Sequence, residues 1–244
     1  HKVMIIADLI RSINPRAKIV MVIGNLLDEA VLDELLDCDL VLNCTDTEHS
    51  RAALGDFANH YLLPFFDVAV LMEGREGQLT SELVEFCHYG PGLPCAFCDR
   101  RISQHRLTYE LLTEEERQQK RDAAAAAVAR GLDGNQYWAG EPAQVLTVGH
   151  LTTTAGGLLA GYAIGYLTGS PRSPASRFQI DLLSLGFGFV SARREAAPTC
   201  SCIHAQGHAD QARADRAISR PQHWPAPEIR VIPAPDDAQS ACRR

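Results

Sequence analysis

Apolar positions in the first seventy residues switch repeatedly between helical and strand spacing. Helical spacing relates Val3, Ile6, Ile10 and Ile13, and this helix should end before Asn14-Pro15, because proline disfavours helical conformation in the preceding residue. The pattern then predicts a strand at 18–24, a helix capped by Asp28 and running through Leu36, a strand at 39–44, a helix at 48–61 and a strand at 65–70. Alternating helices and strands with short connections indicate a parallel sheet with crossover helices. We therefore expect α/β architecture: the second half of a doubly wound, Rossmann-like sheet.

The pattern changes after Gly74. It predicts a strand at 78–86, a turn-rich stretch at 89–94, one polar helix at 104–130, a long uncharged helix at 144–168 and strands at 177–183 and 187–193. From about Arg213 the chain is rich in Pro, Ala and charged residues and has no periodicity. We expect one partial domain over residues 1–212, with late antiparallel strands, and a loosely ordered tail over 213–244.

Composition limits the classes of partner that the chain is expected to bind. The chain has 244 residues, of which 46% are hydrophobic, and a net charge of -7, so no basic field favours nucleic acid or an anionic membrane. No secretory signal opens the sequence, and the cytoplasm is the expected location. The sequence starts at His1 inside an amphipathic pattern, which we interpret as an N-terminal truncation.

The uncharged stretch from Pro142 to Pro171 allows two interpretations. A run of 18 or more uncharged apolar residues can span a bilayer, but this stretch carries His150, three threonines and several glycines. Its flanks also lack the clustered positive charge that anchors membrane spans. We favour a buried helix, at about 145–168, that packs in the core or in a homodimer interface.

An acidic residue follows the predicted strand at 39–44. Ligands of open α/β sheets bind outside the carboxyl ends of the strands, where Asp46 could coordinate magnesium bound to phosphates. The alternative is that Asp46 or Thr45 only caps the helix starting near Glu48. Spacing alone favours neither role.

Two cysteine pairs have the spacing of metal ligands. A Cys-x-x-Cys turn at Cys95 and Cys98, together with Cys200 and Cys202, could close one tetrahedral zinc site. The second pair is closer in sequence than is usual, so His204 or His208 could replace a thiolate. The alternative is that the pairs are fortuitous or that the zinc has been lost.

Several catalytic motifs are missing. The sequence contains no G-x-G-x-x-G or Walker-type glycine loop, so any phosphate-binding loop would have to lie upstream of His1. It also lacks the G-x-S-x-G elbow of serine hydrolases.

From Lys2 to about Asp210 the motifs together resemble the ThiF/MoeB/HesA family of adenylyltransferases, relatives of ubiquitin-activating enzymes. Asp39-Leu-Val-Leu-Asn-Cys-Thr-Asp46, with Arg51 after it, is similar to the family's D-x-V-x-x-x-T-D-N-x-x-x-R signature. The other matching segments are Lys2 with Ile13-Asn14-Pro15, Pro64-Phe-Phe, Gly92-Leu-Pro-Cys95-Ala-Phe-Cys98, Leu167-Thr-Gly169, Cys200-Ser-Cys202 and Gly207-His-Ala-Asp210.

The resemblance implies an ATP-dependent enzyme that converts the C-terminal carboxylate of a ubiquitin-like or sulfur-carrier protein into an acyl-adenylate and releases pyrophosphate. It implies that Lys2 contacts the triphosphate, that Asp46 acts on Mg²⁺ and the phosphates, and that the four cysteines hold structural Zn²⁺. Thr47 stands where the family has Asn, and we assign it to the nucleotide site. The family's glycine loop and phosphate-binding arginines precede His1, so we expect this segment alone to be inactive. No cysteine lies between Cys98 and Cys200, so we expect adenylation without a thioester there.

Two alternatives remain open. The chain could be a non-catalytic module that keeps the carrier-docking surface and the zinc. A nicotinamide-type Rossmann enzyme is disfavoured, because it would give the cysteine pairs no role.

Overall fold

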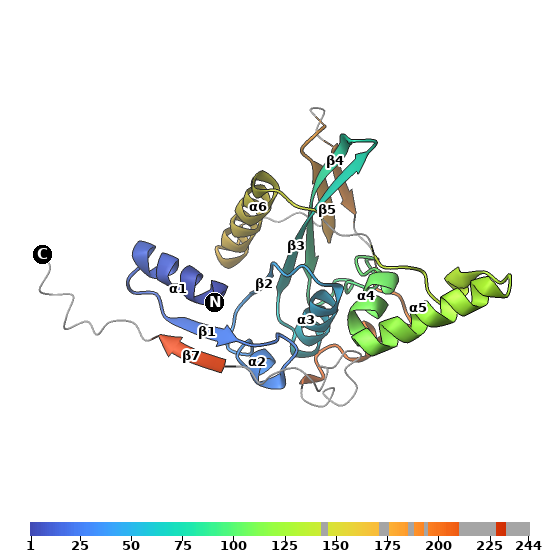
Figure 1. Ribbon diagram of the computed structural model, residues 1–244. Coiled ribbons are helices and arrows are strands. Elements are labelled where there is room, and N and C mark those ends of the chain that lie inside the picture. Colours follow the sequence, from blue (N-terminus) through green and yellow to red (C-terminus); the bar gives the residue numbers. More distant parts are fainter. Residues whose placement is uncertain (143–145, 171–175, 185–187, 193–194, 210–227, 233–244) are drawn as a thin grey trace, which may run out of the picture. The chain divides into compact units, whose positions relative to one another are not determined.

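The computed structural model (Figure 1) describes residues 1–142, 146–170, 176–184, 188–192, 195–209 and 228–232. They belong to two compact units, one of His1–Asp37 with Ser219–Arg244 and the other of Cys38–Ile218. This division differs from the expected single domain over 1–212. Within the described ranges, every helix is too short or too polar to span a bilayer.

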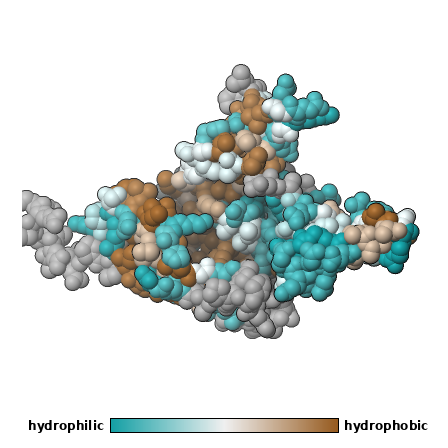
Figure 2. Space-filling view, in the orientation of Figure 1, coloured by the Kyte–Doolittle hydropathy of each residue, from teal (hydrophilic) through white to brown (hydrophobic). Residues whose placement is uncertain are grey.

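The first unit contains helices α1 (Lys2–Ile13) and α2 (Glu29–Asp33) and a two-stranded sheet. Helix α1 ends at Asn14, as the following proline predicts, and the Asp28 side chain caps α2 by accepting from the Ala30 amide. Figure 2 shows a hydrophobic surface over α1, where Ile5, Leu9 and Ile13 are among the exposed side chains.

The sheet of the first unit corrects one expectation. Strand β1 (Ile19–Ile23) pairs antiparallel with β7 (Glu228–Ile232), so that Ile19 lies opposite Ile232. The tail expected to be loosely ordered thus contains a strand in its described part. The physical reason is that β7 contains the β-branched residues Ile229, Val231 and Ile232, which favour strand conformation, and that β1 is also rich in β-branched residues.

The second unit is built on a five-stranded sheet of order β2-β3-β4-β5-β6. Its strands are β2 (Val41–Asn43), β3 (Phe65–Arg75), β4 (Gln78–Tyr89), β5 (Arg177–Asp181) and β6 (Gly188–Ala192). Strands β2 and β3 are parallel, and the other neighbours are antiparallel. The parallel pair is joined by helix α3 (Glu48–Tyr61), whose bounds are those that the sequence pattern predicts.

Strands β3 and β4 are longer than predicted and form a hairpin. Arg75 pairs with Gln78 across the two-residue turn Glu76-Gly77. Both turn residues have positive φ, 54° and 79°, as in the hairpin turns that match the twist of the strands. The glycine supplies the turn conformation at little cost, and the hairpin extends the sheet beyond the expected strand end at Val70.

The polar helix expected at 104–130 is two helices, α4 (Gln104–Leu111) and α5 (Glu114–Ala129). The break falls at Thr113, whose side chain accepts from the Glu116 amide while the Glu116 side chain accepts from the Thr113 amide. This reciprocal capping starts a new helix, and its T-x-x-E signal is present in the sequence. Figure 2 shows the mainly hydrophilic surface of this part of the unit.

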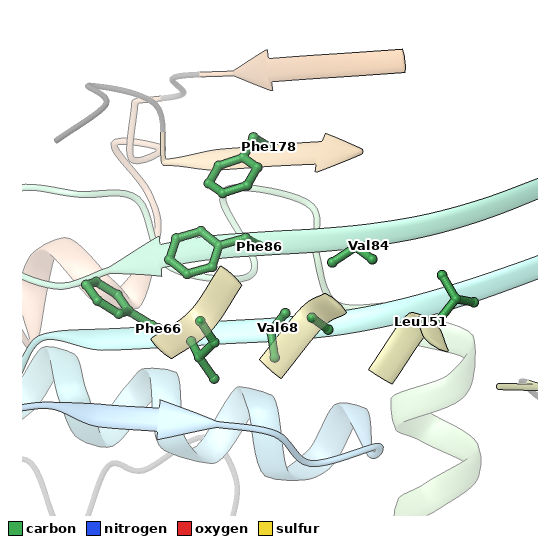
Figure 3. Packing of buried hydrophobic residues seen from close by; sticks show 8 residues of the cluster. Phe66, Val68, Val84, Phe86, Leu151 and Phe178 are labelled. Atoms are coloured by element: carbon green, nitrogen blue, oxygen red, sulfur yellow. The ribbon is translucent and has the colours of Figure 1, made fainter. Parts of the chain in front are cut away.

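Helix α6 (Gly149–Leu167) packs one stripe on the sheet. Leu151, Ala155, Leu159 and Ala163, spaced four residues apart, are its buried residues. They meet alternate side chains of β3, β4 and β5, namely Phe66, Val68, Val84, Phe86 and Phe178 (Figure 3). The rest of α6 is largely exposed, so burial of that side in a dimer stays a prediction. A short turn (Gly134–Gln136) follows α5, and the described chain of this unit ends after helix α7 (Ser201–His204).

Candidate functional site

The candidate site starts where β2 ends. Residues Cys44 to Thr47 connect β2 to α3 at the carboxyl end of the strand, and the Asp46 side chain is exposed there. The cap of α3 is neither Asp46 nor Thr45 but Thr47, whose side chain accepts from the Ser50 amide. The capping alternative considered from the sequence is therefore wrong for Asp46, and its carboxylate is available to a ligand.

The amides at the start of α3 already have acceptors. The Thr47 Oγ1 lies 3.2 Å from the Ser50 amide nitrogen and 2.5 Å from the Ser50 Oγ. The Glu110 carboxylate on α4 accepts from the amides of Glu48 at 3.2 Å and His49 at 2.8 Å. A phosphate would therefore have to displace Glu110 to bind at this helix end.

The loop before Asp46 is held by side chains on both sides of Thr45. The Thr45 amide donates to Asn43 Oδ1 at 3.2 Å, and Arg51 Nη2 donates to the Thr45 carbonyl at 2.7 Å. Both side chains also bind one oxygen, Asp67 Oδ1, with Asn43 Nδ2 at 2.7 Å and Arg51 Nε at 3.2 Å. Asn43 and Arg51 thus hold the amide and the carbonyl of Thr45, and Asp67 binds both of these side chains. Asp46 is the next residue.

Burial sets the electrostatics beneath the loop. Desolvation raises the pKa of Asp67, against which the guanidinium groups of Arg51 and Arg101 act. Burial likewise raises the pKa of Glu48 in the first turn of α3, again opposed by Arg101 and Arg51. Arg51 and Arg101 therefore oppose the protonation that burial favours at Asp67 and Glu48.

The four predicted cysteine ligands come together. The Sγ atoms of Cys95, Cys98, Cys200 and Cys202 all lie within 4.8 Å of one another. The Cys95–Cys200 pair is 3.6 Å apart and the Cys98–Cys202 pair 3.8 Å. A tetrahedral zinc with Zn–S bonds of about 2.3 Å requires S···S separations of about 3.8 Å, which these two pairs match, so the cluster could hold a metal ion. The separations are much longer than a disulfide bond of about 2.05 Å.

Two loops and a short helix build this cluster. In the first loop, the Asp99 amide donates to the Cys95 carbonyl at 2.9 Å, which closes the turn that aims both thiols inward. The Ala197 amide donates to Cys98 Sγ at 3.3 Å, and Asn59 of α3 donates to the Cys202 carbonyl at 2.7 Å. Hydrogen bonds to sulfur and to the backbone around it orient the ligands, as in established metal sites.

The environment of the thiols also favours a cation. Burial raises the pKa of Cys95, and burial first of all raises that of Cys202 to about 12. Clustered thiolates repel one another, and a divalent ion compensates their charge and deprotonates them on binding. His204 and His208 are exposed, and neither belongs to the cluster.

The other predicted residues are placed less fully. Lys2 is the first residue of α1, is exposed and belongs to the first unit, whereas Asp46 and Thr47 belong to the second. The Thr47 oxygen is engaged in the helix cap, so a nucleotide would compete with the cap for it. The nucleotide roles of Lys2, Asp46 and Thr47 remain predictions. The sequence pattern did not indicate Asp67, which binds Asn43 and Arg51, or Arg101 and Glu110, which contact the first turn of α3.

Solved structures similar to this chain include several of E. coli MccB. The complex with AMPCPP and selenomethionine MccA has a TM-score of 0.47 and 14% identity, over 73% of this chain and 43% of that one. The complex with ATP has a TM-score of 0.42 and 16% identity over 73% and 43%, and that with MccA-N7isoASN has 0.45 and 17% over 73% and 44%. This chain therefore spans less than half the length of those proteins.

Comparison with curated proteins finds no match. The ThiF family, in contrast, matches residues 1–202, which is most of the chain. This match and the cysteine cluster confirm the Rossmann-like α/β fold expected from the sequence. The chain belongs to the ThiF family.

Proposed function

We propose that the protein is an ATP-dependent adenylyltransferase that activates a carboxylate. The substrate carboxylate oxygen attacks the α-phosphorus of ATP, an acyl-adenylate forms, and pyrophosphate leaves with the electron pair of the broken P–O bond. The observation that carries the proposal is the exposed Asp46 at the carboxyl end of β2, in a loop that Arg51 and Asn43 hold in place. Membership of the ThiF family supports the same activity.

Each predicted residue has a role that its chemistry allows. Asp46 supplies a carboxylate for Mg²⁺ bound to the phosphates of ATP, and magnesium sites of this kind use one or two protein carboxylates. A magnesium ion held there would neutralise charge that develops on the departing pyrophosphate. Lys2 adds a cation for the triphosphate, and Thr47 sets the position of the loop as the cap of α3. The four cysteines hold structural Zn²⁺ and join the segments near residues 95 and 200.

The finer proposal concerns the partner. Following the motif resemblance, we assign the substrate to the C-terminal carboxylate of a ubiquitin-like or sulfur-carrier protein. We also assign the exposed side of α6 to a homodimer interface. The net charge of -7 supports a protein partner over nucleic acid.

Pyrophosphate exchange in the intact protein tests the proposal. Exchange should require ATP, Mg²⁺ and a carrier with a free C-terminal carboxylate. Asp46→Ala should slow exchange by on the order of 100- to 1,000-fold, as deletion of comparable electrostatic groups does. The control is Glu73→Ala, which removes an exposed carboxylate on β3 outside the ThiF-like signature and should leave exchange unchanged.

The outcomes separate the alternatives. An intact wild-type protein that binds the carrier but catalyses no exchange would be a non-catalytic module. Exchange that survives Asp46→Ala would mean that this carboxylate does not organise the metal. Because Asp46 is exposed, the substitution should change the free energy of unfolding by no more than about 0.5 kcal/mol, so lost activity is not explained by unfolding.

A further inference from the structure

Arg101 connects the cysteine cluster to the interior of the second unit. It lies three residues after Cys98, and its amide donates to the Ala96 carbonyl inside the Cys95–Cys98 turn at 2.8 Å. The preceding Arg100 has a φ of 54° and an exposed side chain, whereas only 12% of the Arg101 side chain is exposed. The turn that presents the thiols therefore also directs the Arg101 side chain into the protein.

The guanidinium of Arg101 meets carboxylates from three elements. Its Nε lies 2.6 Å from Glu85 Oε2 on β4 and 3.7 Å from Asp67 Oδ2 on β3. Its Nη1 lies 3.9 Å from Glu48 Oε1 in the first turn of α3. The other oxygen of Glu85 is held by Arg177 and Gln179 of β5, so Glu85 keeps partners without Arg101, whereas Asp67 depends on Arg51 and Arg101 for charge compensation.

Asp67 carries this contact to the candidate active-site loop. Its second oxygen, Oδ1, binds Asn43 and Arg51, which hold the amide and carbonyl of Thr45. Asp46 is the next residue. A series of contacts therefore runs from the cysteine turn through Arg101, Asp67 and Arg51 to the loop, and its link between Arg101 and Asp67 is an ion pair at 3.7 Å without a hydrogen bond.

Loss of Arg101 should weaken this series at Asp67. Burial already favours the neutral carboxyl of Asp67, and Arg101 is one of the two cations that oppose it. Removing one partner of a buried ion pair leaves an uncompensated charge. The carboxyl then takes up a proton more readily and binds Arg51 less strongly, so the hold on Thr45 relaxes.

We propose that Arg101 is a positioning residue that couples zinc occupancy of the cysteine cluster to the loop carrying Asp46. This inference rests on the proposed function for its catalytic consequence, but the coupling itself involves neither ATP nor the carrier. The zinc acts on the loop only through the position of the Cys95–Cys98 turn and hence of the Arg101 guanidinium.

The direct test is hydrogen exchange of the Thr45 amide, resolved by NMR in the zinc-loaded intact protein. In Arg101→Gln, exchange at this amide should become faster by about fivefold, the change expected when its hydrogen bond to the neutral acceptor Asn43 Oδ1 is lost. The amides of Val68 and Val84 in the sheet should be unaffected. Arg100→Gln is the matched control, because it removes a neighbouring positive charge of the same turn that is exposed.

Zinc removal provides the second measurement. Chelation in the wild-type protein should accelerate Thr45 exchange before that of Val68 and Val84, and should add little in Arg101→Gln, because both changes break the same connection. An unchanged Thr45 amide in zinc-loaded Arg101→Gln would overturn the proposal. If that variant does not fold, chelation of the wild type decides: a Thr45 amide no more sensitive than the sheet amides overturns it.

A catalytic readout distinguishes positioning from general stability. In the pyrophosphate-exchange assay, Arg101→Gln should raise the magnesium concentration for half-maximal rate and leave the KM for the carrier unchanged. If hydrogen exchange at Thr45 responds to Arg101→Gln and to chelation as expected, but the wild type catalyses no pyrophosphate exchange, only the proposed function is contradicted. If the wild type catalyses pyrophosphate exchange but hydrogen exchange at Thr45 responds neither to Arg101→Gln nor to chelation, only this inference is contradicted.

Discussion

Thr47 allows the strongest test of the local structure at the candidate site. Its Oγ1 accepts from the Ser50 amide at 3.2 Å, and replacing a threonine cap by alanine costs about 1 kcal/mol. For a domain of this size, 1 kcal/mol lowers the Tm by about 2–4 °C. We therefore expect Thr47→Ala to lower the Tm of the zinc-loaded protein by this amount, measured by calorimetry together with urea denaturation.

Thr47→Asn is the matched variant. Asparagine caps helices at least as well as threonine, so this change should alter the free energy of unfolding by only a few tenths of a kcal/mol. It also restores the residue that the ThiF-like signature carries at this position. If Thr47 additionally contacts the nucleotide, the KM for ATP will change in Thr47→Asn although the stability does not.

The reasoning fails if the two variants do not separate. A Thr47→Ala protein as stable as the wild type would show that the cap contributes nothing at this helix. Equal destabilisation of the alanine and asparagine variants would show that packing of the threonine methyl group, and not its oxygen, stabilises the start of α3.

Three further predictions concern the cluster and the long helix. We expect the wild-type protein to bind about one zinc per chain in metal analysis, and Cys98→Ser to abolish this binding. Cys44→Ser should retain the zinc, because that exposed thiol lies outside the cluster. Undiminished zinc in Cys98→Ser would rule the site out. Leu151→Ala should destabilise the unit by about 2–5 kcal/mol in urea denaturation, because the side chain is fully buried, while Val128→Ala on α5, 61% exposed, should change little. Equal effects would contradict the packing of α6. The intact protein should remain in the supernatant without detergent, and recovery only with membranes would refute our interpretation of the 145–168 helix.

Local patterns predicted the elements that local physics determines. The bounds of the helix at 48–61 could be predicted from its local pattern, although its cap is Thr47 and not Asp46 or Thr45. The break at Thr113 was equally local, and its capping box was overlooked in favour of the continuous polar pattern. The β1–β7 pairing could not be predicted in this way, because its two strands are separated by about two hundred residues and neither encodes the register.

The residues of the candidate site also differ in whether a local sequence signal predicts them. The clustering of the four cysteines could be predicted because a Cys-x-x-Cys turn is a short-range signal. The position of Asp46 at a strand end is equally local, and its role stays a prediction. Glu110 had no such signal, because its contact with the amides of Glu48 and His49 joins helices more than sixty residues apart in sequence and leaves no spacing to recognise.

Asp67 and Glu85 nevertheless had a detectable signal that pattern reading passed over. Each is a lone carboxylate inside an apolar strand, in Phe-Phe-Asp-Val-Ala-Val and Leu-Val-Glu-Phe-Cys. Burying such a charge costs several kcal/mol, and a hydrophobic residue of similar volume is often at least as stable there, so stability alone does not explain either residue. The register places Asn43 opposite Asp67, and both lie on the face of the sheet opposite the one that α6 covers. Asp67 binds the two side chains that hold Thr45, and Glu85 binds Arg101, the second cation beside Asp67. We therefore explain both buried charges by the geometry that they impose next to Asp46, while the apolar residues under α6 supply stability on the other face of the sheet.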